Sequence, residues 1–216
     1  MKVWLVIICL FSAVNVTANT VGESRWQFDV LLDDKKIGYH DFLVKEQGGQ
    51  QVIQTNARFD IKILFIKVFS YRHENEERWQ GNCLRAINAT TDSNGDDFVV
   101  RGEATSDGFS VKTLSDQQDL PACLMTFAYW NPDFLQEKRL LNSQTGEYEA
   151  VTITQQGQED VLINDKAVKA VKYLIDVEAG PITLWYAADD RQWLALESVV
   201  EGGKTLRYQP VVIPAT

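Results

Sequence analysis

Hydrophobic and polar residues alternate with a period of two along most of this chain, which is the spacing of a β-strand that buries one face. Between residues 25 and 44, Trp26, Phe28 and Val30 share one face, and the alternation breaks at residues 33–36, where two aspartates and two lysines predict a turn. Comparable stretches cover residues 52–61, 68–79, 83–91, 98–105, 108–114, 147–157, 159–164, 169–177, 181–190, 192–200 and 204–212. The pattern predicts about a dozen strands.

Turn residues separate these stretches. Asn94-Gly95 is a strong hairpin signal because glycine tolerates the positive φ of a type I′ turn. We find no long amphipathic helix, no low-complexity linker and no internal repeat, and an open antiparallel sheet of this size usually curls. The sequence therefore predicts an all-β fold: a single large antiparallel sheet curled into a half-barrel or barrel, with one short helical insertion as a plug.

The predicted insertion is the segment LPACLMTFAYWNPDFL, residues 120–135. From Pro121 its pattern is compatible with a short helix that Pro132 would end near Asn131, since the residue before a proline avoids the helical conformation. Such a segment must cover an apolar surface, because it carries five large apolar side chains: Leu124, Phe127, Tyr129, Trp130 and Phe134. The sequence leaves open whether it plugs a solid core or covers a ligand cavity.

The first eighteen residues have the pattern of a cleaved signal peptide. Lys2 is followed by the apolar run 3–14, which is too short to span a bilayer, and cleavage is expected after Ala18. A lipoprotein signal using Cys9 is the alternative, but Ile8 is too bulky for the residue before that cysteine. We expect residues 19–216 to form a single β-rich domain that is exported, periplasmic or secreted, and that has no transmembrane segment after cleavage.

Charge and cysteine content restrict the function further. Removal of Lys2 with the signal peptide changes the formal net charge from −9 to −10, which argues against nucleic acid and anionic lipid surfaces as partners. Cys83 and Cys123 then remain, and an even pair in an oxidising compartment predicts a disulfide. A redox-active pair is the alternative, but the chain has no CxxC motif.

No catalytic or cofactor signature appears: the chain lacks GxSxG, HExxH, a phosphate-binding glycine-rich loop and zinc-type Cys/His spacing. We therefore predict no cofactor, no metal and no catalytic residue. Residues 92–97 resemble a calcium loop only faintly, because their glycine is fourth instead of sixth. No carboxylate lies inside an apolar run, so the sequence predicts none whose pKa burial would raise.

Aromatic residues are the remaining signal. On an unbroken strand over residues 68–79, one face carries aromatic side chains together with His73, one of only two histidines, His40 being the other. His73 could be a base or a polar anchor in a cavity, or a half-buried histidine bonded to a neighbouring strand. If the insertion covers this face, the candidate ligand-binding residues are Phe69, Tyr71, His73, Trp79, Tyr129 and Trp130.

Four motifs are similar to a family of secreted bacterial proteins catalogued only as a domain of unknown function: WQGNCL (79–84), FAYWNP (127–132), LLNSQTGE (140–147) and LWYAADD (184–190). The similarity covers about residues 25–209. In a more distant envelope family, a glycine motif opens the second strand, as Ile37-Gly38 does here. The resemblance implies an exported β-rich protein, and it carries over neither catalytic residues nor a ligand.

Three functional hypotheses follow. The first is a periplasmic binding or carrier protein for a lipid or other apolar ligand, with His73 anchoring a head group. The second is an envelope interaction or assembly module whose barrel has a solid core. The third and least supported is an enzyme, which would need His73 or His40 beside a serine or an acid in a cleft.

Overall fold

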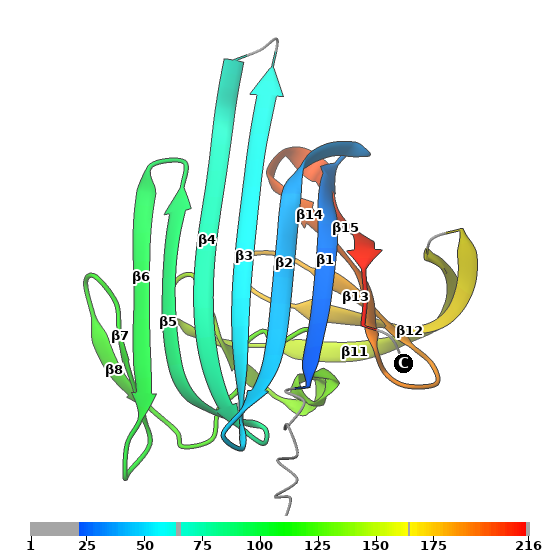
Figure 1. Ribbon diagram of the computed structural model, residues 1–216. Helices are drawn as coiled ribbons and strands as arrows, with labels where there is room; N and C mark the ends of the chain where they lie inside the picture. The colour runs from blue at the N-terminus through cyan, green and yellow to red at the C-terminus, as the bar shows by residue number, and fades with distance from the viewer. Residues whose placement is uncertain (1–21, 64–65, 164, 215–216) are drawn as a thin grey trace, which may run out of the picture.

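The structure is a computed structural model that describes residues 22–63, 66–163 and 165–214, so the predicted signal peptide lies outside the described residues. Thirteen strands form one antiparallel sheet in the order β11-β12-β13-β14-β15-β1-β2-β3-β4-β5-β6-β7-β8, whose ends do not meet (Figure 1). The strands of this sheet are β1 (Glu23–Leu32), β2 (Lys35–Gln47), β3 (Gln50–Ile63), β4 (Ile66–Gln80), β5 (Cys83–Ser93), β6 (Asp96–Ala104), β7 (Phe109–Lys112), β8 (Gln117–Leu120), β11 (Thr152–Ile163), β12 (Lys166–Asp176), β13 (Ile182–Ala187), β14 (Trp193–Val200) and β15 (Lys204–Val212). The predicted curled, all-β sheet is confirmed.

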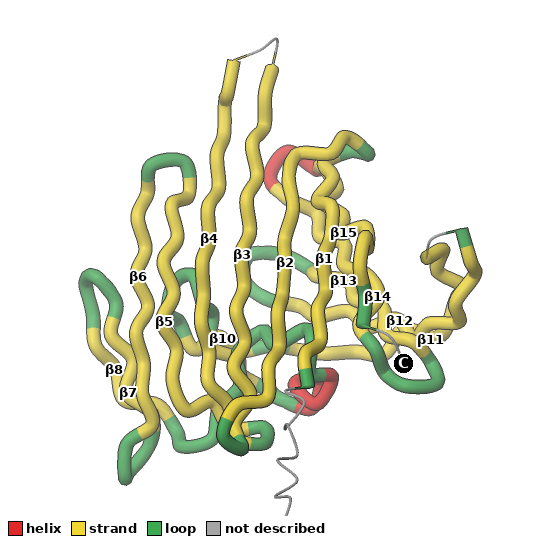
Figure 2. The backbone as a smooth tube through the Cα atoms, viewed as in Figure 1, coloured by secondary structure: helices red, strands yellow, loops and turns green. Residues whose placement is uncertain are grey.

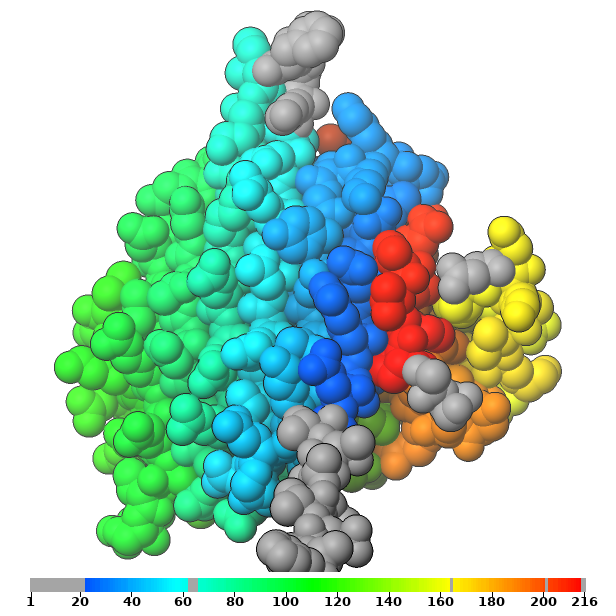
Figure 3. All heavy atoms as spheres, in the orientation of Figure 1, coloured from blue at the N-terminus to red at the C-terminus, as the bar shows by residue number. Residues whose placement is uncertain are grey.

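The sheet curves so that its two halves pack on one hydrophobic core. Strands β1 to β6 stand side by side as one wall, and β11 to β13 cross behind them at a steep angle (Figures 1 and 2). Pairing of β15 with β1 joins the two walls, with Val30 opposite Tyr208. Figure 3 shows the outer face, on which β15 lies directly beside β1 although the two strands are at opposite ends of the described chain. The inner face of this wrap holds the core and the site.

Two glycines explain local features of the first wall. Asn94 and Gly95 have φ of 58° and 98°, as the predicted hairpin between β5 and β6 requires, and the Gly95 N–H donates to Asp92 Oδ1 over 2.8 Å. Gly38 is needed for close approach instead, because a Cβ atom there would lie 1.8 Å from the backbone oxygen of Arg58 on β3. The glycine of the Ile37-Gly38 motif therefore lets β2 and β3 pack closely.

Aromatic rings join the two walls. Trp193 on β14 is completely buried, and its ring centroid lies 4.3 Å from that of Phe28 on β1 and 5.1 Å from that of Phe42 on β2. Tyr129 of the insertion lies 5.3 Å from the same indole. Because large aromatic side chains bury the most apolar area, this cluster contributes strongly to the stability of the wrap.

The insertion fills part of the inner face, but its helix is not where the sequence predicted it. The 3₁₀ helix η1 (Pro132–Gln136) begins at Pro132, and the segment before it is irregular. Proline is favoured in the first turn because it needs no N–H donor there, and the Asn131 side chain caps the helix by accepting from the Asp133 N–H over 3.1 Å. Pro132 therefore starts the helix instead of ending it.

The insertion is anchored along its length. The N–H of Leu84 on β5 donates to the Leu124 oxygen over 3.1 Å, and the N–H of Leu141 donates to the Met125 oxygen over 2.9 Å. Leu141 belongs to β9 (Arg139–Leu141), which pairs with β10 (Tyr148–Ala150) in a small second sheet. As predicted, the large apolar side chains of the insertion pack on the core.

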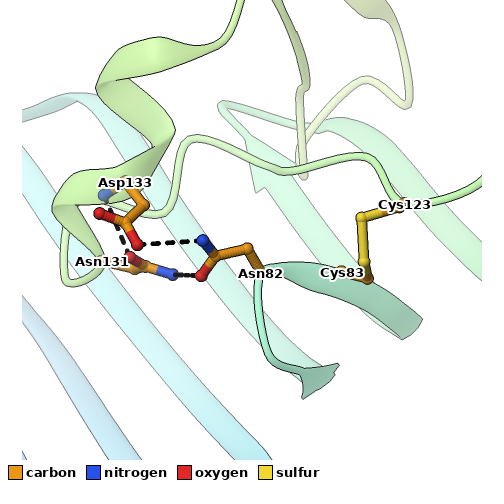
Figure 4. The surroundings of a disulfide bond; sticks show 5 residues. All are labelled: Asn82, Cys83, Cys123, Asn131 and Asp133. Carbon is orange, nitrogen blue, oxygen red and sulfur yellow. Dashed lines mark hydrogen bonds between the residues drawn. A yellow bond between two sulfur atoms is a disulfide. The ribbon is translucent and has the colours of Figure 1, made fainter.

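A disulfide fixes the start of the insertion to β5. Cys83 and Cys123 are bonded, with their Cα atoms 4.2 Å apart, so the predicted disulfide is confirmed. Asn82 adds polar contacts beside it: its Nδ2 donates to Asp133 Oδ2 over 3.0 Å, and its Oδ1 accepts from Asn131 over 3.2 Å (Figure 4).

A short second 3₁₀ helix, η2 (Glu201–Gly203), connects β14 and β15. None of the described helices is long and apolar enough to cross a membrane.

Candidate functional site

A cavity of about 230 Å³ lies between the inner face of β2 to β4 and the insertion. This volume is slightly below the range of about 300–1,000 Å³ that is typical of sites for drug-sized ligands. The sheet contributes a mainly polar wall, and the insertion contributes aromatic side chains. The residues that line the cavity include His40, Phe42, Ile53, Thr55, Tyr71, His73, Asn75, Glu77, Thr126, Phe127, Tyr129, Trp130, Gln144, Glu149 and Tyr208.

Four of the six candidate ligand-binding residues line this cavity: Tyr71, His73, Tyr129 and Trp130. Trp79 does not line it. Its indole is completely buried beside the cavity, edge-on to Trp130 with 5.6 Å between ring centroids. Phe69 is half-buried, pairs with Ile61 on β3 and lies outside the cavity lining. The structure thus brings His73 and the insertion's aromatic residues together and leaves Phe69 apart from them.

Sequence reasoning missed the polar residues of β4 that lie closest to its candidates. Asn75 and Glu77 follow His73 on the same face, and both are buried, with 8% and 3% of their surface exposed. The expectation that burial raises the pKa of no carboxylate is wrong, because burial raises that of Glu77. The signal was present, since these positions have the same parity as His73 and Trp79, but their burial depends on the insertion that covers them.

Glu77 accepts three hydrogen bonds. Asn75 Nδ2 donates to Oε1 over 2.9 Å, while the Trp79 indole N–H and the Thr126 hydroxyl donate to Oε2 over 2.8 and 3.3 Å. Burial raises the pKa of Glu77 above its usual value, and the three hydrogen bonds oppose that rise. The carboxyl group is thus held by donors that suit its ionised form, in a place where an unpaired charge is unfavourable.

Both histidines of the described chain line the cavity in their neutral form. Burial lowers the pKa of His73 to about 4, and its Nδ1 lies 2.8 Å from the hydroxyl of Thr91. Burial, with a smaller contribution from the charge of His73, holds the pKa of His40 well below its ordinary value. His40 Nδ1 lies 2.9 Å from the Tyr208 hydroxyl. At neutral pH, neither imidazole supplies a positive charge to the cavity.

The tyrosines around the cavity remain protonated. Burial raises the pKa of Tyr71, Tyr129 and Tyr208. Smaller contributions come from Glu149 for Tyr129, and from neighbouring tyrosines for Tyr129 and Tyr208. The Tyr71 hydroxyl donates over 2.9 Å to Oε1 of Gln144, which lies in the turn between β9 and β10. These side chains therefore supply neutral rings and hydroxyl groups to the cavity wall.

Two buried polar atoms of the wall have no hydrogen-bond partner among the described residues: Asn75 Oδ1 and His40 Nε2. Buried polar groups are nearly always paired, so two orphans beside one cavity are informative. Since Asn75 Nδ2 is engaged by Glu77, its Oδ1 is left as a free acceptor. The described residues contain no group of three or more His, Cys, Asp or Glu side chains that could hold a metal ion.

Comparison with known families identifies one family model that matches most of the chain. The family model described as Domain of unknown function (DUF6134) matches residues 28–211. The chain belongs to this family. The predicted resemblance to a family catalogued only as a domain of unknown function is therefore confirmed. No curated protein matches this DUF6134 chain.

A solved structure shares the fold of this DUF6134 protein. It is described as a beta-barrel-like protein of domain of unknown function DUF1849 from Brucella abortus, and it matches with a TM-score of 0.63 over 90% of this chain and 98% of its own. Sequence identity is 10%, so the likeness concerns the fold alone. The curled sheet is therefore an arrangement that the two proteins share.

Proposed function

We propose that this DUF6134 protein is a non-enzymatic binding or carrier protein for a small amphipathic molecule, or for the polar end of a lipid. The observation that carries the proposal is the pair of unpartnered buried atoms, Asn75 Oδ1 and His40 Nε2, beside a cavity lined by aromatic rings. A bound ligand that hydrogen-bonds to these atoms would remove the cost of burying them unpaired.

The cavity also bears on the alternatives. An assembly module with a solid core has no use for a polar cavity inside its sheet, so the cavity favours ligand binding. In a catalytic arrangement of this kind, the histidine that contacts the hydroxyl group is itself oriented by a third group. His73 and His40 contact the hydroxyl groups of Thr91 and Tyr208, but no hydrogen bond between described residues joins either imidazole to a further side chain, which favours a binding role.

We further propose that the protein acts in an exported compartment. The bonded pair Cys83–Cys123 supports this, because disulfides persist in oxidising compartments. The apolar run of residues 3–14 supports it as well. The mass of the protein recovered from the periplasm or medium of its native host, with or without residues 1–18, tests this part of the proposal.

The ligand proposal is tested by native mass spectrometry of the oxidised protein, followed by organic extraction and titration with amphiphiles. Tyr71→Ala should weaken binding at least tenfold, because Tyr71 lines the cavity. Phe69→Ala is the matched control: Phe69 is also half-buried, lies two positions away on the same face of β4 and does not line the cavity. Equal losses in both variants, or no binding of any amphiphile to the wild type, would refute the proposal.

A further inference from the structure

The charged side chains that line the cavity are acidic. Glu77 and Glu149 line it, and no lysine or arginine is found among its described lining residues. Glu77 is buried, and none of the ion pairs between described residues includes it. The cavity therefore has acidic groups and no basic side chain to neutralise them.

A buried carboxylate without a counter-charge is strongly disfavoured, whereas one paired with a cation and held by hydrogen bonds is stable. The donors around Glu77 are already in place for the ionised form: the Trp79 indole N–H can only donate, and Asn75 presents its amide nitrogen. What this arrangement lacks is a positive charge. A ligand that enters the cavity can supply it.

The other groups of the wall favour the same kind of ligand. Asn75 Oδ1 is a buried acceptor without a donor among the described residues, so it suits a ligand N–H. Tyr71, Tyr129 and Trp130 line the cavity with aromatic rings, whose faces attract cations. An acidic group, a free acceptor and aromatic faces together are suited to an organic ammonium ion.

We propose that the ligand carries a protonated amine, which forms an ion pair with Glu77, donates an N–H to Asn75 Oδ1 and lies among the rings of Tyr71, Tyr129 and Trp130. This inference rests on the proposed binding function and specifies the chemistry of the polar end of the ligand.

Isothermal titration of the oxidised wild-type protein with four probes of equal chain length tests this inference: octylamine, octyltrimethylammonium, octanol and octanoate. We expect octylamine to bind at least tenfold more tightly than octanol and octanoate. It should also exceed octyltrimethylammonium, which has no N–H for Asn75. Equal binding of all four probes, or a preference for octanoate, would overturn the amine inference and leave the binding function standing. Failure of every probe would overturn both.

Two variants test whether Glu77 is the carboxylate that pairs with the amine. Glu77→Gln keeps the size of the side chain and removes its charge, so octylamine affinity should fall at least tenfold while octanol affinity is unchanged. Glu76→Gln is the matched control, because Glu76 is adjacent on β4 but faces outward, where it contacts Gln54 and Arg78. An equal effect of the two substitutions would overturn the assignment of Glu77. The probe series needs only the wild type, so it decides the inference even if Glu77→Gln does not fold.

Discussion

The disulfide should contribute about 4 kcal/mol to the free energy of unfolding. Cys83 and Cys123 are 40 residues apart, and closing a loop of that length restricts the unfolded chain by about 4 kcal/mol in the chain-entropy model. For a protein of this size, each 1 kcal/mol corresponds to about 2–4 °C in melting temperature, so loss of the bond should lower it by about 8–16 °C. The perturbation is the double substitution Cys83→Ser and Cys123→Ser.

The assay is urea unfolding, followed by tryptophan fluorescence, of the wild type and the double variant. Because the bond acts through the unfolded state, its removal should also steepen the dependence of stability on urea, as the unfolded chain exposes more surface. Asn82→Ala is the control. It removes the contacts to Asn131 and Asp133 in the same region and should cost about 1 kcal/mol, because those hydrogen bonds are exposed.

Two results would refute this reasoning. A loss below about 1 kcal/mol in the double variant would mean that the insertion is held by its packing, and that loop closure contributes little. A large loss without any change in urea dependence would mean that the bond acts on the folded state. In that case the ligand-binding assays should be repeated under reduction, because the insertion supplies Tyr129 and Trp130 to the cavity.

Three further predictions concern the fold. The pKa of His73 is about 4 in the folded protein and about 6.5 in the unfolded chain, where its imidazole is exposed to water. Protonation of His73 should therefore lower the free energy of unfolding by about 3 kcal/mol as the pH falls from 7 to 4, and this pH dependence should be absent from His73→Gln. Gly38→Ala should destabilise by about 1–3 kcal/mol or more, because its Cβ would overlap the Arg58 backbone oxygen. Trp193→Ala should cost about 3–5 kcal/mol, because its buried ring joins the two walls.

All three can be measured by urea unfolding. For His73, the decisive quantity is the difference between the wild type and His73→Gln at pH 7 and at pH 4, and a constant difference would contradict the lowered pKa. Wild-type stability in Gly38→Ala would show that β2 and β3 can separate easily at that point. A loss below about 1 kcal/mol in Trp193→Ala would show that the walls are held together mainly by backbone pairing.

The alternation of polar and apolar residues was enough to predict the sheet, because strands such as β1, β4 and β5 bury every second residue against the core. It also predicted the hairpin at Asn94-Gly95, where the local conformation depends on two adjacent residues that tolerate positive φ. The insertion was harder. Pro132 is compatible with either end of a helix, and only the capping contact from Asn131 to Asp133 decides between them.

The candidate site was predicted in part for a similar reason. Parity along β4 correctly grouped Tyr71 and His73, which line the cavity. The same parity included Glu77, but a glutamate among charged neighbours is typical of a solvated edge. Its burial is set by Thr126 and the rest of the insertion, which is about fifty residues further along the chain. His40 reaches the cavity from a different strand, so no local pattern could place it there.

The division of the inner face into two parts supports a functional origin for the cavity. Around Trp193 and Phe28 the face is completely buried and apolar, as stability alone would favour. Along β4 the same face carries His73, Asn75 and Glu77, whose burial opposes folding unless their polar atoms are satisfied. The disulfide and the packing around Trp193 can compensate for that cost, because both stabilise the folded protein without engaging the polar atoms of these three side chains. A polar wall maintained in this way, opposite a tethered aromatic insertion, supports the proposed recognition of a ligand with a polar or charged end.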